Sequence, residues 1–379
     1  MKLLISLIIK FNYLAACLIT ALSLTTLFYA EIISAEALTS NVFISPKGAD
    51  TNALEGHIEN THPSRLSRAD NAPLVTVSEH LMSTEVVFTI QTEDRNGGLK
   101  AIAAAVSEIR RITKIMSEWE PDSQVSLLNR EAHFRAVQVS QELYRILDTS
   151  YSLSEFTNGK FDITFKSAGK LWDFRKATIP STEKIEQAIS RIDYRRITFV
   201  PDTSAIRFQN AGVQIGLGGI AKGYAVDRAV QIIKHAGFDE FTVNAGGDLY
   251  AVSRGQNKLW RVGIRDPRND KKLIAIVPVA NAAVATSGDY ERYFIHQGQR
   301  YSHIIDPDTG YPATLCQSVT ILAPRAFLAD AIATGVFVLG PEKGMAKIEQ
   351  RADIEGIIID SDGEIHLSSG LKHLDIDMH

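Results

Sequence analysis

The stretch Val213-Gln-Ile-Gly-Leu-Gly-Gly-Ile-Ala-Lys-Gly-Tyr-Ala-Val-Asp227 decides between the fold classes open to this chain. A strand-like apolar run enters a turn that contains Gly216, Gly218 and Gly219, and a helix-like run then leaves it with Lys222 in its first turn. Glycines let a backbone approach a ligand closely, and the unpaired N–H groups of a helix N-terminus bind phosphate oxygens. The stretch therefore predicts a site for a phosphorylated molecule.

The pattern Gly216-x-Gly218-x-x-Ala221 also fits a loose dinucleotide-binding motif, which is weak without its structural context. A dinucleotide-binding unit needs an acidic residue at the end of the next strand, where it binds the ribose. Around the strand predicted over residues 241–245, the acidic side chains come before the strand or after the two glycines that follow it. A P-loop needs Lys followed by Ser or Thr, and Lys222 is followed by glycine. Both nucleotide-binding folds are therefore disfavoured.

The rest of the chain predicts an α+β fold with mixed, largely antiparallel sheets. Apolar residues at three- and four-residue spacings predict an amphipathic helix over residues 98–119. Ser140 and Asn158-Gly159 are typical start and stop signals for a helix over 141–154. Turn-rich segments join most of the strands, a pattern more typical of α+β than of doubly wound folds. Helices are also expected after Ser181, from Ala221 and over 327–339, and strands over 85–91, 241–245, 249–253, 261–264, 273–279, 301–306, 318–323, 354–359 and 365–367.

Residues 1–37 are predicted to be a signal peptide or an N-terminal membrane anchor. Lysines near the start, an uncharged run over 13–30 and the small-x-small pattern Ala35-Glu-Ala37 indicate a secretory signal with a cleavage site. Leu14-Ala-Ala-Cys17 also fits a lipobox, which would make the chain a lipoprotein through Cys17, and the uncharged run is of borderline length for a retained anchor. All three alternatives place the rest of the chain outside the cytoplasm, so we expect a periplasmic location, anchored to the inner membrane in two of them.

The remaining composition is that of an ordinary globular protein. Residues 38–75 are polar and without periodicity, which predicts a linker, and residues 76–379 are long enough for a domain with a large core. The 379-residue chain has a formal net charge of −4 and no long basic run, so no nucleic-acid partner is expected. Cys17 and Cys316 are the only cysteines, so no disulfide is expected once Cys17 is removed or lipidated.

Asp330 and Thr334 lie four residues apart in an apolar helix-like run and therefore share one face. A carboxylate and a hydroxyl in such a run need partners, because burying each one unpaired costs about 1–3 kcal/mol. Two oxygen ligands with room for water and phosphate oxygens suit Mg²⁺, and a local hydrogen-bonded pair is the alternative. His303, on the strand predicted over 301–306, is either a base or ligand that faces a pocket or a core histidine, and Asp289 belongs to a polar turn over 286–290.

These segments, taken in order, resemble the FAD:protein FMN transferases, the ApbE-type flavin transferases of the bacterial periplasm. The resemblance extends from about Met82 to Leu339. Its motifs are Met116-Ser-Glu-Trp-Glu-Pro-Asp-Ser-Gln-Val-Ser-Leu-Leu-Asn129, Gly159-Lys-Phe-Asp-Ile-Thr164, Gly218-Gly-Ile-Ala-Lys-Gly-Tyr-Ala-Val-Asp227, Asn244-Ala-Gly-Gly-Asp248, Thr286-Ser-Gly-Asp-Tyr290, Ser302-His-Ile-Ile-Asp-Pro307 and Ala329-Asp-Ala-Ile-Ala-Thr334.

The resemblance implies an activity and a set of site residues. Enzymes of this family cleave FAD, release AMP and attach FMN through a phosphoester bond to a Thr or Ser of a partner flavoprotein. The resemblance also implies that Mg²⁺ is bound by the carbonyl of Gly219 and the side chains of Asp330 and Thr334. His303 or Asp289 would assist the incoming hydroxyl. The residues expected to contact FAD are Met82, Trp119, Lys160, Phe161, Asp162, Gly216, Lys222 and Ile304.

Gly216 is the one departure from the family pattern. The family usually has Asp-Leu-Gly-Gly where this chain has Gly-Leu-Gly-Gly, so a carboxylate that would accept a hydrogen bond from FAD is missing. Losing such a bond costs about 0.5–1.5 kcal/mol. Two other readings stay open: an FAD pyrophosphatase that gives FMN and AMP, and a non-catalytic FAD-binding lipoprotein.

Overall fold

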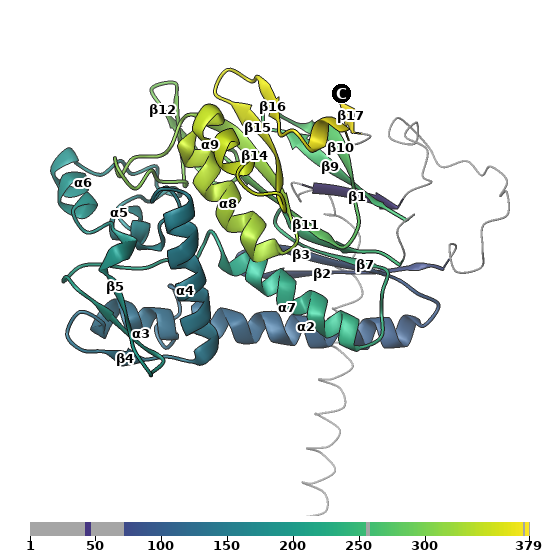
Figure 1. Cartoon of the computed structure of the whole chain (residues 1–379), viewed down its shortest axis with the longest axis horizontal. Helices are drawn as coiled ribbons and strands as arrows, with labels where there is room; N and C mark the ends of the chain where they lie inside the picture. Colours follow the sequence, from purple (N-terminus) through teal and green to yellow (C-terminus); the bar gives the residue numbers. More distant parts are fainter. Residues whose placement is uncertain (1–41, 47–71, 255–257, 374–375, 379) are drawn as a thin grey trace, which may run out of the picture. The chain divides into compact units, whose positions relative to one another are not determined.

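An eight-stranded antiparallel sheet is the largest element of the structure, a computed structural model that describes residues 42–46, 72–254, 258–373 and 376–378 (Figure 1). Its strand order is β16-β15-β14-β11-β8-β7-β3-β2, and each neighbouring pair is antiparallel. The predicted α+β class is therefore confirmed. The strands are β2 (Leu74–Leu81), β3 (Thr84–Gln91), β7 (Phe241–Ala245), β8 (Asp248–Val252), β11 (Ala282–Gly288), β14 (Cys316–Ala323), β15 (Glu355–Asp360) and β16 (Ile365–Leu367).

Smaller antiparallel sheets complete the β structure. One has the order β1-β9-β10-β17, and its strand β1 lies within the stretch predicted as a linker. The others are the β12–β13 hairpin and the sheet β4-β6-β5. Their bounds are β1 (Val42–Pro46), β4 (Val137–Gln138), β5 (Ile197–Val200), β6 (Ala205–Phe208), β9 (Trp260–Asp266), β10 (Asn269–Val279), β12 (Tyr293–His296), β13 (Gln299–Ser302) and β17 (Asp377–Met378).

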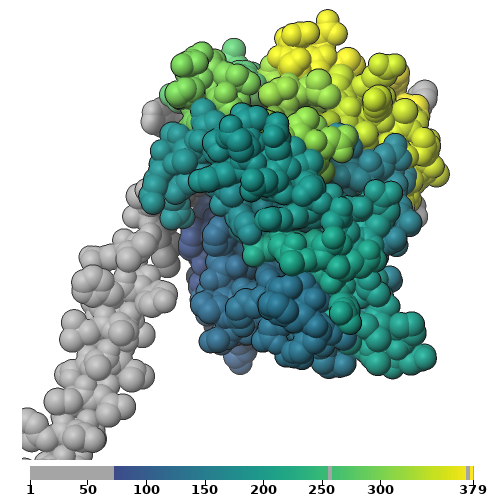
Figure 2. Space-filling model, turned by 90° about the vertical axis from the view of Figure 1, so that its left-hand side faces the viewer, coloured from purple at the N-terminus to yellow at the C-terminus, as the bar shows by residue number. Residues whose placement is uncertain are grey.

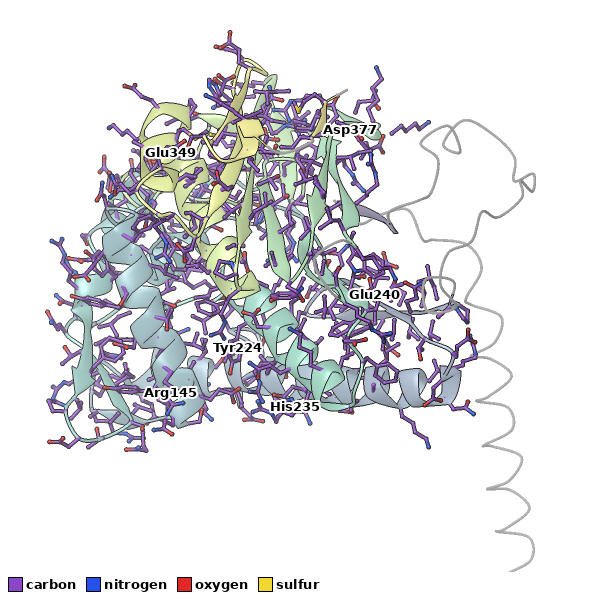
Figure 3. All side chains as sticks on the ribbon, turned by 45° about the vertical axis from the view of Figure 1, so that its right-hand side comes forward. Arg145, Tyr224, His235, Glu240, Glu349 and Asp377 are labelled. Carbon is purple, nitrogen blue, oxygen red and sulfur yellow. The ribbon has the colours of Figure 1, made fainter. Side chains whose placement is uncertain are left out.

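Three helices, α2 (Arg95–Met116), α7 (Ala221–His235) and α8 (Ala326–Leu339), share the main hydrophobic core with the large sheet (Figure 1). Twelve of the fourteen residues of α8 are buried, including Asp330. Tyr224, labelled in Figure 3, lies on α7. Its Oη donates to Glu142 Oε1 on α4 (2.7 Å), which ties these two helices together. Figure 2 shows the side of the molecule on which α4 to α6 lie. The remaining α-helices are α3 (Gln124–Glu131), α4 (Gln141–Phe156), α5 (Lys166–Gly169), α6 (Thr182–Ile189) and α9 (Pro341–Ile348).

Helices α7 and α8 touch backbone to backbone at Gly223. An ideal Cβ on Gly223 would lie 2.7 Å from Phe327 Cα and closer still to the carbonyl of Ala326. One turn further along α7, the carboxylate of Asp227 accepts the N–H groups of Ala326 (2.9 Å) and Phe327 (3.2 Å), so it caps the N-terminus of α8. The side chain of Arg325, the residue before α8, makes no such cap. The glycine and the aspartate together fix how the two helices meet.

Most of the predicted elements are present, and the differences that affect the site lie at α2, β11, β13 and residues 213–217. Helix α4 begins after Ser140, as predicted, and ends at Phe156, just before the left-handed pair Asn158-Gly159 that was expected to stop it. Helix α2 ends at Met116 rather than Trp119, and β13 ends at Ser302, so neither Trp119 nor His303 lies in its predicted element. Strand β11 runs through Thr286 and Ser287 to Gly288, where a turn was expected, and residues 213–217 form no strand.

The predictions for residues 1–37 lie outside the described residues and stay predictions. Within the part of the chain that the structure describes, no helix is both long enough and apolar enough to cross a membrane.

Replacing Gly223 tests the helix contact. We expect Gly223→Ala to lower the free energy of unfolding by about 1–3 kcal/mol, because the added methyl group meets backbone atoms that cannot rotate away. Urea unfolding of the purified chain measures this. Gly218→Ala is the matched control: no atom lies within 4 Å of its added Cβ and its φ is outside the left-handed region, so a change within about 0.5 kcal/mol is expected. Equal losses in the two variants would contradict the packing argument.

Candidate functional site

The glycine segment is held in place by hydrogen bonds to neighbouring helical segments, α3 and the 3-10 helix Ile163–Phe165, rather than by a sheet. The amide of Asn129 donates to the carbonyl of Ile215 (2.9 Å) and accepts from its N–H (2.7 Å). The N–H of Gly216 donates to the carbonyl of Ile163 (2.8 Å). Leu217 and Ile220 are buried on either side of the turn, whereas Gly218 between them is exposed. The turn is therefore anchored at both ends and presents its backbone outward.

Gly219 lies against the hydroxyl of Thr334. An ideal Cβ on Gly219 would lie 3.0 Å from Thr334 Oγ1 and 3.4 Å from the ring of Phe161. Thr334 Oγ1 donates to the carbonyl of Asp330 (3.1 Å) and lies 3.3 Å from Ser287 Oγ on β11. The structure thus brings Gly219, Asp330 and Thr334 together, although Gly219 is distant from the other two in sequence.

The half-buried Lys222 and two buried aspartates form a charge cluster beside this group. Lys222 Nζ lies 2.6 Å from Asp248 Oδ2 and 3.3 Å from each oxygen of Asp330. Asp330 Oδ2 also accepts the N–H of Gly223 (3.2 Å). Burial lowers the pKa of Lys222, but the charges of Asp248 and Asp330 outweigh it and raise that pKa above its usual value. Burial first, and then the charge of Asp330, raise the pKa of Asp248 well above the usual value.

The donor chemistry of this group fits Mg²⁺. Asp330 supplies a carboxylate and Thr334 a hydroxyl from one face of α8, and the backbone of Gly219 lies next to that hydroxyl. Oxygen ligands alone are what Mg²⁺ prefers in proteins, and it usually takes few of them. The two carboxylates, Asp248 and Asp330, face a single ammonium group, so a further cation would balance the buried charge. The sequence pattern assigns no role to Asp248, although this residue lies in one of the quoted motifs.

His303 lies just beyond β13, where its N–H donates to the carbonyl of Arg292 (2.9 Å). Burial, and after it the positive charges of Arg292 and Lys222, lower the pKa of His303 to about 4. Among the described residues, the buried Nδ1 atom has no hydrogen-bond partner. His303 is therefore neutral at pH 7 and has a ring nitrogen available.

Asp289, the other expected participant, is engaged in ion pairs. Both of its oxygens accept from the guanidinium of Arg268 at 2.7 Å, and Arg300 Nε lies 3.8 Å away. Both oxygens of this carboxylate are thus occupied by N–H donors, whereas Nδ1 of His303 has no partner among the described residues. The catalytic role of Asp289 stays a prediction, and His303 is the better candidate.

The expected FAD-contact segment over residues 160–162 makes internal contacts. Lys160 Nζ binds Asp306 (2.7 Å) and Asp308 (2.8 Å), which ties the segment to the turn after His303. Asp162 accepts the N–H groups of Thr164 (2.7 Å) and Tyr194 (2.8 Å). Burial raises the pKa of Asp162 to about 6. The side chains of Lys160 and Asp162 thus hold the loop in place.

The other expected contacts occupy distinct positions. Met82 lies in the β2–β3 turn with a left-handed φ of 51°. Near this turn, the N–H of Gly246, between β7 and β8, donates to the carbonyl of Glu85 on β3 (3.1 Å). Ile304 is buried, and its carbonyl accepts the N–H of Ala313 (2.8 Å). Trp119 is 76% exposed and follows α2, so it is not a buried residue at the end of the helix predicted over 98–119. FAD contacts at these positions stay predictions.

Comparison with known proteins assigns the chain to a family. Residues 82–358 match the family model described as the ApbE family. The chain is 34% identical over 292 residues to the FAD:protein FMN transferase of Treponema pallidum, covering 71% of this chain and 81% of that protein. It is 29% identical over 294 residues to an FAD:protein FMN transferase of Klebsiella pneumoniae, covering 76% of this chain and 90% of that protein.

Solved structures of ApbE proteins have the same fold as this chain. The ApbE protein of Thermotoga maritima has a TM-score of 0.74 at 33% identity, covering 80% of this chain and 99% of that one. The apo flavinyl transferase ApbE of Pseudomonas stutzeri has a TM-score of 0.71 at 26% identity, covering 80% and 96%. The chain belongs to the ApbE family of flavin transferases. The predicted family, fold and enzyme class, a transferase, are confirmed.

The low pKa of His303 predicts a pH-dependent stability. Between pH 6.5 and about 4 the unfolded chain takes up a proton on this histidine that the folded chain does not, so stability is lost as the pH falls through that window. The loss amounts to about 3 kcal/mol at most. We expect His303→Gln to lose less stability between pH 7.5 and pH 4.5 than the parent, as measured by urea unfolding. His80→Gln, at an exposed position on β2, is the control and should follow the parent. A parallel loss in His303→Gln and the parent would contradict the burial of a neutral histidine.

Proposed function

We propose that the chain is a Mg²⁺-dependent FAD:protein FMN transferase. It would cleave FAD, attach FMN through a phosphoester bond to a Thr or Ser of an exported or membrane flavoprotein, and release AMP. The observation that supports this most is the meeting of Gly219, Asp330 and Thr334 beside the ammonium of Lys222. That arrangement offers cations and outward backbone to a pyrophosphate, in a chain whose relatives carry this enzyme name.

The reaction is a displacement at the phosphorus of the FMN half. The hydroxyl oxygen of the acceptor forms a bond to that phosphorus, and the bond from the same phosphorus to the bridging oxygen breaks. AMP leaves with the bridging oxygen, and the hydroxyl proton passes to a base. His303 suits that role because it is neutral near pH 7 and its Nδ1 has no partner among the described residues.

Gly219, Asp330 and Thr334 would hold Mg²⁺, whose positive charge favours the negative charge that develops on the phosphate oxygens. Lys222 remains next to Asp330 and adds a second positive charge on the same side. The buried Asp248 keeps the ammonium of Lys222 in position, because its oxygen is the nearer of the two carboxylate partners. The chain's own contribution is thus to hold the pyrophosphate among fixed charges.

The place of action follows from the N-terminus. A signal or anchor over residues 1–37 would carry residues 76–379 into the periplasm, where an exported flavoprotein is the acceptor. Whether Cys17 is lipidated, the signal is cleaved near Ala37 or the anchor is retained changes the attachment to the inner membrane but not the compartment.

A transfer assay tests the function. The purified chain is incubated with FAD, Mg²⁺ and an acceptor domain that another enzyme of this family modifies. We expect a fluorescent acceptor band and a mass gain of one FMN on a Thr or Ser. Asp330→Asn should reduce the rate about a hundredfold or more, because it removes the carboxylate that would hold Mg²⁺ against the transferred phosphate. EDTA should abolish transfer, and added Mg²⁺ should restore it.

Asp353→Asn is the matched control, since Asp353 is an exposed carboxylate paired with Arg351, and it should transfer FMN at the parent rate. AMP release without an acceptor, and without transfer when a competent acceptor is present, would instead identify a pyrophosphatase. Tight FAD binding without any turnover would identify a non-catalytic binder. Either result would overturn the proposal.

A further inference from the structure

The side chain of Glu118 fills the space beside Gly216. An ideal Cβ on Gly216 would overlap Glu118 Oε2 and would lie 3.2 Å from Glu118 Cδ and from a ring carbon of Phe165. Glu118 follows α2 in the chain, whereas Gly216 belongs to the glycine segment. With Glu118 in this position, only a glycine fits at residue 216 without a shift of its neighbours.

Glu118 neutralises a buried lysine. Glu118 Oε1 lies 2.5 Å from Lys166 Nζ, and the two side chains are 12% and 10% exposed. An ammonium buried to this extent is costly without an anionic partner, and Glu118 is the carboxylate that the structure places against it. The second oxygen, Glu118 Oε2, is buried and has no hydrogen-bond partner among the described residues.

The same ammonium supports an exposed aromatic ring. Lys166 Nζ lies 3.6 Å from the centroid of the Trp119 ring, while Trp119 as a whole is 76% exposed. The backbone of Trp119 is fixed as well, since its N–H donates to Ser117 Oγ (3.2 Å). Trp119 follows Glu118, whose carboxylate lies against Gly216. Gly216 is three residues from Gly219, which corresponds to at most about 11 Å of extended chain. An FAD molecule bound at Gly219 is therefore long enough to reach the Trp119 ring.

We propose that Glu118 is a positioning residue for FAD binding and that it replaces a carboxylate at residue 216. Its ion pair with Lys166 holds the Trp119 ring so that the open face of the indole stacks on an aromatic ring of FAD. The inference rests on the proposed function, because it takes FAD as the substrate.

Coupling between residues 118 and 216 follows from this geometry. An Asp at 216 would bring its carboxylate into the volume that Glu118 now fills, so either residue alone could neutralise Lys166. Both together crowd and repel each other, and the absence of both leaves the ammonium buried and unpaired. The two substitutions should therefore be strongly non-additive.

A double-mutant cycle measures the coupling. The four proteins are the parent, Glu118→Ala, Gly216→Asp and the double variant, and the readout is the FAD dissociation constant from quenching of tryptophan emission. Trp172 and Trp260 are 6% and 2% exposed, so the red-shifted part of the emission reports Trp119. We expect each single variant to bind FAD about tenfold more weakly and the double variant to bind within about threefold of the parent.

Two further variants separate charge from folding. Glu118→Gln keeps the shape of the side chain and removes its charge, so it should fold, shift the emission of Trp119 and raise KM for FAD with little change in kcat. Glu120→Ala removes an exposed carboxylate from the same loop and should bind FAD as the parent does. An emission spectrum and FAD affinity in Glu118→Gln equal to those of the parent would overturn the proposal, and so would a double variant whose loss equals the product of the single losses.

The outcome is distinguishable from a failure of the proposed function. FAD titration requires no transfer, so the cycle still reports on Glu118 if the parent binds FAD but modifies no acceptor. A parent that transfers FMN together with an additive cycle would refute the role of Glu118 alone.

Discussion

The backbone contact between α7 and α8 at Gly223 sets the geometry that the rest of the site uses. Lys222 lies next to this glycine on α7, while α8 carries Asp330 and Thr334. A side chain at residue 223 would push α8 away, and the ammonium would lose its 3.3 Å contact with the carboxylate. Asp227 secures the same contact by capping α8, and two hydrogen bonds from its N-terminus offset the burial that raises the pKa of this carboxyl. One helix crossing thus fixes three functional groups.

The cluster that this crossing creates is electrostatically incomplete. Asp248 and Asp330 share one ammonium, from Lys222, in a buried setting where an excess negative charge is costly. The raised pKa of Asp248 expresses that cost. A divalent cation at Asp330 and Thr334 would offset it, and a pyrophosphate would then bring compensating negative charge. Because both carboxylates are buried, this excess of negative charge favours the proposed metal and phosphate site over a purely structural salt bridge.

Sequence reasoning succeeded where the signals are local. Helix α4 has its cap at Ser140 and its left-handed stop in adjacent residues, so its bounds could be predicted closely. It failed at Trp119, because the apolar period continues past Met116 while Ser117 leaves the helix and its hydroxyl accepts the N–H of Trp119. Residues 213–217 look like a strand, but their hydrogen bonds go to Asn129 and Ile163 instead of a sheet. The expected metal ligands rest on the family resemblance, and nothing local predicted the full set of them. The cap from Asp227 depends on a contact between helices far apart in the chain, which no local pattern specifies.

Gly216 shows how a motif can mislead when residues are compared position by position. Compared with the family motif, Gly216 stands where a carboxylate is usual, which would predict the loss of a hydrogen bond to FAD. In space, Glu118 fills the volume that a side chain at 216 would need, and its carboxylate is paired with Lys166. Lys166 is too deeply buried to remain unpaired, so a chain without an acid at 216 must supply one from elsewhere. The buried ammonium of Lys166 needs an anionic partner, and Glu118 supplies it from outside the glycine segment. Gly216 alone therefore does not imply weaker FAD binding.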